Sequence, residues 1–161
     1  MVALIVLVLG VLGAAAMTLT ALRDGKQSGL RSQASALAYE LGDMMRANRV
    51  PVTNESIFTG PVPSFVTTCW TTGCIPADMA KNDYYEWHQK LVGPGGLPNG
   101  EAVICHDSTK LADSYYPACD GLATSPLVVK LKWDEKNNNA RDAASPTSVT
   151  TRYLVVTLQP F

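Results

Sequence analysis

The first 22 residues form an apolar segment without a charged or histidine side chain, and the first charge along the chain is Arg23. A helix of this length matches the roughly 30 Å hydrocarbon layer of a bilayer. A cleaved secretory signal is the main alternative, but it would have a basic residue ahead of a shorter apolar run. The pattern therefore predicts a membrane-spanning helix over residues 1–22.

Beyond Arg23 the sequence becomes amphipathic but keeps its helical pattern, because apolar residues recur every three or four positions. The resulting stripe consists of Leu30, Ala34, Leu37, Leu41 and Met44 or Met45. No proline interrupts this segment before Pro51. We therefore expect one continuous helix over about residues 1–48, on the order of 70 Å long, with no break near Gly10–Gly13.

A second helix is predicted over Pro76–Val92, after a loop at residues 50–75 that is rich in proline, threonine, valine and glycine. Proline suits the first position of a helix, and Asp78 lies in the first turn, where the helix dipole favours an acid. The expected buried face comprises Met79, Tyr84, Trp87 and Leu91. The glycine-rich segment at 93–100 is predicted as a turn, and it lacks the Lys-Ser or Lys-Thr of a phosphate-binding loop.

Three strands are predicted in the rest of the chain, over Glu101–His106, Leu127–Trp133 and Val149–Gln159. The middle strand alternates in character. Its predicted inner face comprises Val129, Leu131 and Trp133, its outer face Lys130 and Lys132, and the inner face of the last strand Leu154, Val156 and Leu158. A polar segment without periodicity joins the last two strands, which indicates a hairpin with a long loop.

The expected fold class is α+β, with the long N-terminal helix packed on a small antiparallel sheet and a short second helix. Residues 1–22 would form the membrane or assembly half of that helix. Residues 23–161 would form the soluble domain, to which the amphipathic half-helix 23–48 belongs.

Four cysteines, Cys69, Cys74, Cys105 and Cys119, lie outside the apolar segment and allow three pairings. We favour the local pairs Cys69–Cys74 and Cys105–Cys119, because each pair brackets its own loop. A zinc site is the alternative, although structural zinc ligands usually come in closer pairs. Disulfides would place the domain outside the cytoplasm, and they outweigh the basic residues after the span, which by themselves favour the cytoplasmic side.

The charge balance and the catalytic motifs exclude several classes of function. A net charge of −1 argues against nucleic-acid binding through bulk phosphate attraction. The best catalytic candidates are His88 with Glu86 and Asp83, and His106 with Asp107, but no G-x-S-x-G or H-E-x-x-H motif is present. The best calcium ligands would be Asp107, Asp113 and Asp120, in a spacing that matches no EF-hand. We expect no catalytic residue, no cofactor and no metal.

Three stretches of the chain resemble the type IV pilins, and two of them the PilV family of minor pilins. The start MVALIVLVLGVLG is similar to the assembly helix of pilins in general. LRSQASALAYELGDMMRANR resembles the first helix of the PilV family, and CWTTGCIPADMAKNDYYEWHQKL resembles its cysteine pair and the helix that follows. The family's processing site, a glycine followed by an aromatic residue and a glutamate, is not in this sequence, and we expect Met1 to lie just downstream of it.

The resemblance implies a type IV pilin fold and a structural function. The chain would be a minor pilin that joins other minor pilins and the major pilin through its N-terminal helix. This complex would prime pilus assembly, sit at or near the filament tip and support a tip adhesin. The protein would reside in the bacterial inner membrane, with one span and a periplasmic domain, and then in the extracellular pilus. A minor pseudopilin of a type II secretion system is the alternative, and whether the pilus serves motility, DNA uptake or adhesion stays open.

A patch of small residues inside the apolar segment is the candidate helix-packing interface. Gly10, Gly13 and Ala14 belong to it, and Gly10 and Ala14 are four residues apart and so share one face of the helix. Within a membrane, small residues let two helices approach closely, which drives their association. We expect this patch to contact the N-terminal helix of another pilin.

Overall fold

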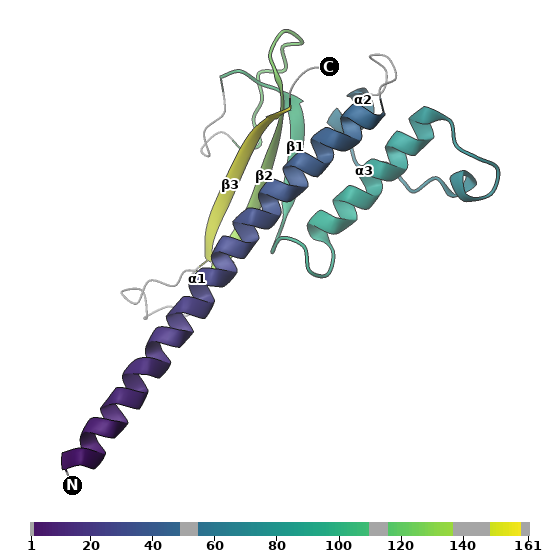
Figure 1. Ribbon diagram of the computed structural model, residues 1–161. Coiled ribbons are helices and arrows are strands. Elements are labelled where there is room, and N and C mark those ends of the chain that lie inside the picture. The colour runs from purple at the N-terminus through teal and green to yellow at the C-terminus, as the bar shows by residue number, and fades with distance from the viewer. Residues whose placement is uncertain (1, 49–54, 110–115, 137–148, 159–161) are drawn as a thin grey trace.

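A computed structural model describes residues 2–48, 55–109, 116–136 and 149–158 (Figure 1). Its elements along the chain are helices α1 (Val2–Ala47) and α2 (Glu55–Thr59), the 3₁₀ turn η1 (Thr67–Trp70), helix α3 (Pro76–Val92), and strands β1 (Glu101–His106), β2 (Leu127–Lys136) and β3 (Val149–Leu158). The fold is α+β, with a long N-terminal helix, a short second helix and a small antiparallel sheet, as the sequence predicts.

Helix α1 runs without a break from Val2 to Ala47, which confirms the prediction of one continuous helix. Its first half projects away from all other described elements, whereas its second half lies along the sheet and α3 (Figure 1). The difference follows from composition, because only the second half combines an apolar stripe with polar residues around the rest of the axis. The buried residues of α1 are Ala34, Leu37, Ala38, Leu41, Gly42 and Met45.

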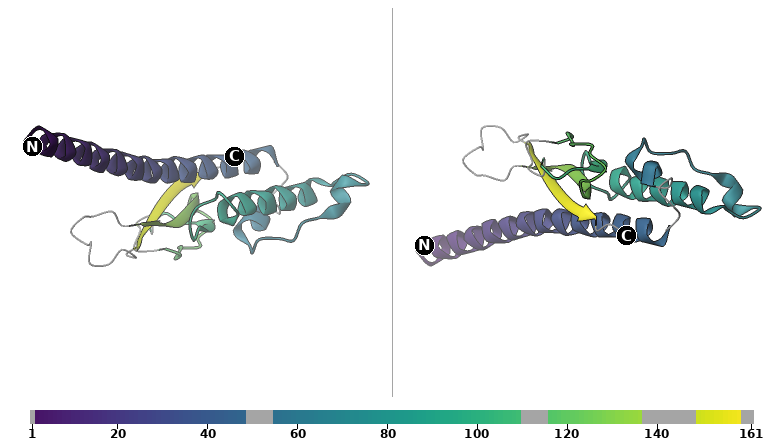
Figure 2. Two further views of the ribbon diagram at one scale, coloured as in Figure 1. Left: turned by 90° about the horizontal axis from the view of Figure 1, so that it is seen from below. Right: turned by 90° about the horizontal axis from the view of Figure 1, so that it is seen from above.

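The three strands form one antiparallel sheet in the order β1-β2-β3. In the centre of the sheet, Val129 lies opposite Ile104 on one side and Val156 on the other. These residues share the inner face, where the stripe of α1 and one side of α3 complete the hydrophobic core. Figure 2 shows α1 and α3 side by side, with the strands beside them.

Helix α3, which the sequence predicts as the second helix, has the predicted bounds, Pro76 to Val92, and most of its predicted buried face. Tyr84, Trp87 and Leu91 are buried, but Met79 is 50% exposed and that part of the prediction is wrong. Ala80 takes its place, because positions 80, 84, 87 and 91 follow the helical repeat and position 79 lies about 100° to one side.

The segment 50–75, predicted as a surface loop, contains the short helix α2 and the turn η1. Phe58 of α2 is 2% exposed, and its ring lies 5.6 Å from that of Tyr84 on α3. One buried aromatic residue thus attaches this segment to the core.

Strand β2 departs from its prediction in two respects. It extends past Trp133 to Lys136, and Glu135 near its end is buried. Lys130, expected on a solvated outer face, is 1% exposed. The extra residues of β2 pair with Val149–Thr151 of β3, and the charged partners of Glu135 and Lys130 are described below. The tip of the predicted hairpin loop, at 137–148, lies outside the described residues.

Candidate functional site

The projecting half of α1 is the largest exposed apolar surface among the described residues. Its large apolar side chains are between 47% and 77% exposed. They are Val2, Leu4, Ile5, Val6, Leu7, Val8, Leu9, Val11, Leu12, Met17, Leu19 and Leu22. Within the part of the chain that the structure describes, α1 is the one helix long and apolar enough to cross a membrane. An apolar surface of this size is unstable in water and requires a cover of lipid or of other apolar helices.

The predicted packing patch lies on this free half of the helix. Gly10, Gly13 and Ala14 are exposed, and a Cβ atom added at either glycine would meet nothing within 4 Å. Packing against the described parts of this chain therefore does not require these residues to be small. Gly42 differs, because a Cβ there would lie 3.3 Å from Cδ2 of Leu158. Its lack of a side chain lets β3 approach α1 closely, which the sequence did not reveal.

A buried carboxylate fixes the point at which α1 leaves the domain. Glu135 Oε1 lies 3.3 Å from Arg31 Nε of α1, and Glu135 Oε2 lies 3.2 Å from Arg152 Nε of β3. Trp133 Nε1 also donates to Oε1, at 3.1 Å. Burial by itself would raise the pKa of Glu135, but the bonds from Arg31, Trp133 and Arg152 outweigh it and hold that pKa below its ordinary value.

Helix α3 is attached to α1 by hydrogen bonds as well as by apolar contact. The buried Trp87 donates from Nε1 to the carbonyl oxygen of Leu37, at 2.8 Å. Near the end of α1, Asn48 Nδ2 donates to Asp83 Oδ2 at 2.6 Å. Polar bonds and the apolar core therefore both hold the second half of α1 to α3, and the projecting half extends from this anchored part.

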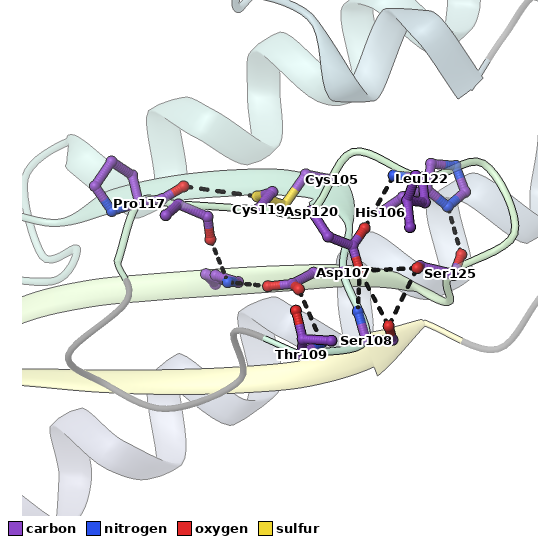
Figure 3. Close-up of a disulfide and its surroundings, with 12 residues drawn as sticks. Cys105, His106, Asp107, Ser108, Thr109, Pro117, Cys119, Asp120, Leu122 and Ser125 are labelled. Atoms are coloured by element: carbon purple, nitrogen blue, oxygen red, sulfur yellow. Dashed lines mark hydrogen bonds and ion pairs between the residues drawn. A yellow bond between two sulfur atoms is a disulfide. The ribbon is translucent and has the colours of Figure 1, made fainter.

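The four cysteines form the two local pairs that the sequence favours, Cys69–Cys74 and Cys105–Cys119. The first closes the turn before α3, where Trp70 is 77% exposed. The second joins the end of β1 to the segment that leads to β2 (Figure 3). With all four sulfurs in disulfides, no thiolate is left for the zinc alternative.

Asp107 and Ala118, two described residues of the segment closed by the second disulfide, lie against Lys130 on the outer face of β2, where an ion pair is buried. Lys130 Nζ binds Asp107 Oδ2, with side-chain exposures of 1% and 0%, and it also donates to the carbonyl oxygen of Ala118 at 2.6 Å. Lysine can be buried here because its charge is paired and its further hydrogens have acceptors. Period-two alternation alone places Lys130 in solvent, since nothing in that pattern shows that Asp107 and Ala118, which precede the strand in the sequence, lie against its outer face.

Asp120 organises the residues next to the second disulfide (Figure 3). Its carboxylate accepts from the backbone N–H groups of Leu122 at 2.9 Å and Ser108 at 2.8 Å, and from the hydroxyl of Ser125 at 2.8 Å. These bonds, the one from Leu122 foremost, lower the pKa of Asp120 to about 2.

The calcium alternative loses two of its three ligands to these contacts. Asp107 binds Lys130, Asp120 binds Ser108 and its neighbours, and Asp113 lies outside the described residues. No group of three or more His, Cys, Asp or Glu side chains among the described residues could hold a metal ion.

Both histidines considered from the sequence lie in described elements, His88 on α3 and His106 at the end of β1. Nδ1 of His88 is buried and has no hydrogen-bond partner among the described residues, and burial lowers the pKa of this side chain. Asp83 accepts from Asn48, and Glu86 is exposed. His106 Nδ1 lies 2.6 Å from the carbonyl oxygen of Ser125.

Comparison with protein-family models, with curated proteins and with solved structures finds no significant match to this chain.

Proposed function

We propose that this protein is a minor pilin of the type IV pilus, of the PilV kind, in a minor-pilin complex that primes assembly and sits at or near the filament tip. It is a structural subunit in this proposal. The other minor pilins and the major pilin bind its N-terminal helix, and the complex supports a tip adhesin.

The unbroken helix α1 is the observation that carries the proposal. Its first half exposes apolar side chains on every side, and its second half is anchored to the sheet and α3. A subunit held first in a bilayer and then in a bundle of like helices needs this combination, because both surroundings cover apolar surface. An anchor for a simple tethered module has no need to continue unbroken into the core of its domain.

The Gly10–Ala14 face tests the proposal. Replacing Gly10 and Ala14 with leucine adds side chains that the bilayer accepts, so insertion should be unchanged. The added bulk should prevent close helix approach and reduce both the number of surface pili and the co-purification of other minor pilins. The measurements are pilus counts by electron microscopy and affinity recovery of the complex, in cells whose only copy is the variant.

A matched control adds bulk to the opposite face of the same helix. Positions 12 and 16 lie about 200° around the axis from positions 10 and 14. Leu12→Phe combined with Ala16→Leu should leave pili and partner recovery closer to normal. Unchanged pili and partners in the Gly10/Ala14 variant at normal protein level would contradict the assembly role of this face. If deletion of the gene abolished protein secretion and spared pili, the protein would be a type II pseudopilin.

A further inference from the structure

Basic side chains gather where α1 emerges from the domain. Arg23 and Lys26 are exposed and lie on the first turn of α1 after the apolar segment. In the next turn, Gln27 Nε2 donates to the carbonyl oxygen of Lys136 at 3.1 Å. That bond brings the end of β2 to the same level of the helix, although Lys136 is more than a hundred residues away in sequence. Arg23, Lys26 and Lys136 are exposed, and none of their side chains forms an ion pair with another described residue.

The charge at this level is positive. Asp24 lies between Arg23 and Lys26, and Asp134 lies two residues before Lys136 on β2, so these two acids leave one net positive charge with Arg23, Lys26 and Lys136. Arg31 lies one turn farther along α1. It and Arg152 share the buried Glu135 of β2, whose single negative charge neutralises only one of the two arginines. The end of the domain that faces the projecting helix is therefore basic, although the chain as a whole carries −1.

The position of this patch along the helix determines what it would meet. Residues 2–22 span about 31 Å at 1.5 Å per residue, close to the thickness of the hydrocarbon layer. Arg23 then lies roughly 1.5 Å beyond that layer, and the level of Gln27 and Lys136 roughly 8 Å beyond it. A headgroup layer is about 5–8 Å deep on each side. The three basic side chains are thus at or within reach of lipid phosphates, within about one Debye length at physiological salt.

We propose that Arg23, Lys26 and Lys136 form a binding surface for the headgroups of anionic phospholipids, which holds the base of the domain against the bilayer. Charge complementarity favours this partner, because the surface is cationic and lies at the depth of the lipid phosphates. The proposal rests on the membrane insertion of α1 that the proposed function includes. Binding also has a consequence for assembly, since the subunit gives up these headgroup contacts when it leaves the membrane.

Lipid selectivity measures this binding directly. The full chain is reconstituted into phosphatidylcholine vesicles that contain a trace of spin-labelled phosphatidylglycerol or spin-labelled phosphatidylcholine, and electron spin resonance gives the fraction of each lipid held at the protein. One basic residue near an anionic surface is worth roughly fivefold in binding. We expect phosphatidylglycerol to be preferred about fivefold or more at low salt, and the preference to fall toward one at 1 M salt, where the Debye length is about 3 Å.

Two variants separate the surface from general electrostatics. Arg23→Gln/Lys26→Gln/Lys136→Gln should abolish the preference. The matched variant Arg46→Gln/Lys81→Gln/Lys90→Gln removes the same charge from residues far from the span and should retain it. Equal selectivity of the wild type and the first variant would overturn the proposal.

Alkaline carbonate extraction of the same vesicles tests the membrane insertion of α1 separately from the headgroup surface. A protein that stays in the bilayer but shows no lipid preference refutes the headgroup surface alone. A protein that carbonate releases refutes membrane insertion, and with it both the headgroup surface and the proposed function.

Discussion

Replacing Lys130 with methionine should destabilise the domain far more than its position on a three-stranded sheet suggests. The substitution keeps the apolar stem but removes the ammonium group, and it leaves the carboxylate of Asp107 at 0% exposure without its cation. Removing one member of a buried ion pair typically costs about 3–5 kcal/mol. Since small domains have stabilities of roughly 5–15 kcal/mol, the variant should lose a large fraction of its free energy of unfolding.

Lys132 provides a matched comparison on the same strand. Its ammonium lies 2.6 Å from Glu101 Oε1, but the two side chains are 24% and 55% exposed. An exposed pair contributes about 0–1 kcal/mol, so Lys132→Met should cost little. The double variant Lys130→Met/Asp107→Asn should recover part of the loss, because it removes the charge left behind in the interior.

Urea unfolding of the full chain in detergent micelles measures these differences. Trp87 and Trp133 are 0% and 3% exposed, so their fluorescence reports the opening of the core. With a slope of about 2 kcal/mol per molar urea, a loss of 3–5 kcal/mol lowers the midpoint by roughly 1.5–2.5 M. A shift for Lys130→Met no larger than that for Lys132→Met would refute the claim that burial makes this pair important.

Three further predictions concern packing and pH. Gly42→Leu should lower the free energy of unfolding by about 1–3 kcal/mol through overpacking, because β3 lies against that position. Thermal denaturation measures this loss, and an unchanged thermal midpoint would contradict the prediction. Trp87→Phe should cost about 1 kcal/mol for the lost bond to α1, and Trp87→Ala about 3–5 kcal/mol, so equal urea midpoints for the two would argue against separate polar and apolar contributions. Asp120 has its pKa lowered from 3.8 to about 2 in the folded protein, so it stabilises the fold above pH 4, and this contribution is lost as the pH falls toward 2. Asp120→Asn should therefore flatten the pH dependence of the thermal midpoint over that interval, and an unchanged profile would contradict the assignment.

The long helix, the second helix and the three strands could be predicted from local pattern because each has its cause in nearby residues. The uncharged run, the stripe beginning at Leu30 and the absence of proline before Pro51 together indicate one helix, and the structure has α1 over Val2–Ala47. Pro76 and Gly93 likewise mark the ends of α3. Propensity, capping and periodicity act over one or two turns, so the sequence alone carries this information.

The contacts that join distant segments were decided by the tertiary structure. Lys130 looks like an outward-facing residue until Asp107 and Ala118 lie against it, and Glu135 looks like part of the polar segment after Trp133 until Arg31 approaches from α1. Gly42 is an ordinary position of the predicted helix until Leu158 packs on it. Burial and pairing depend on which segments meet across the fold, and a local pattern contains no term for a neighbour that is a hundred residues away.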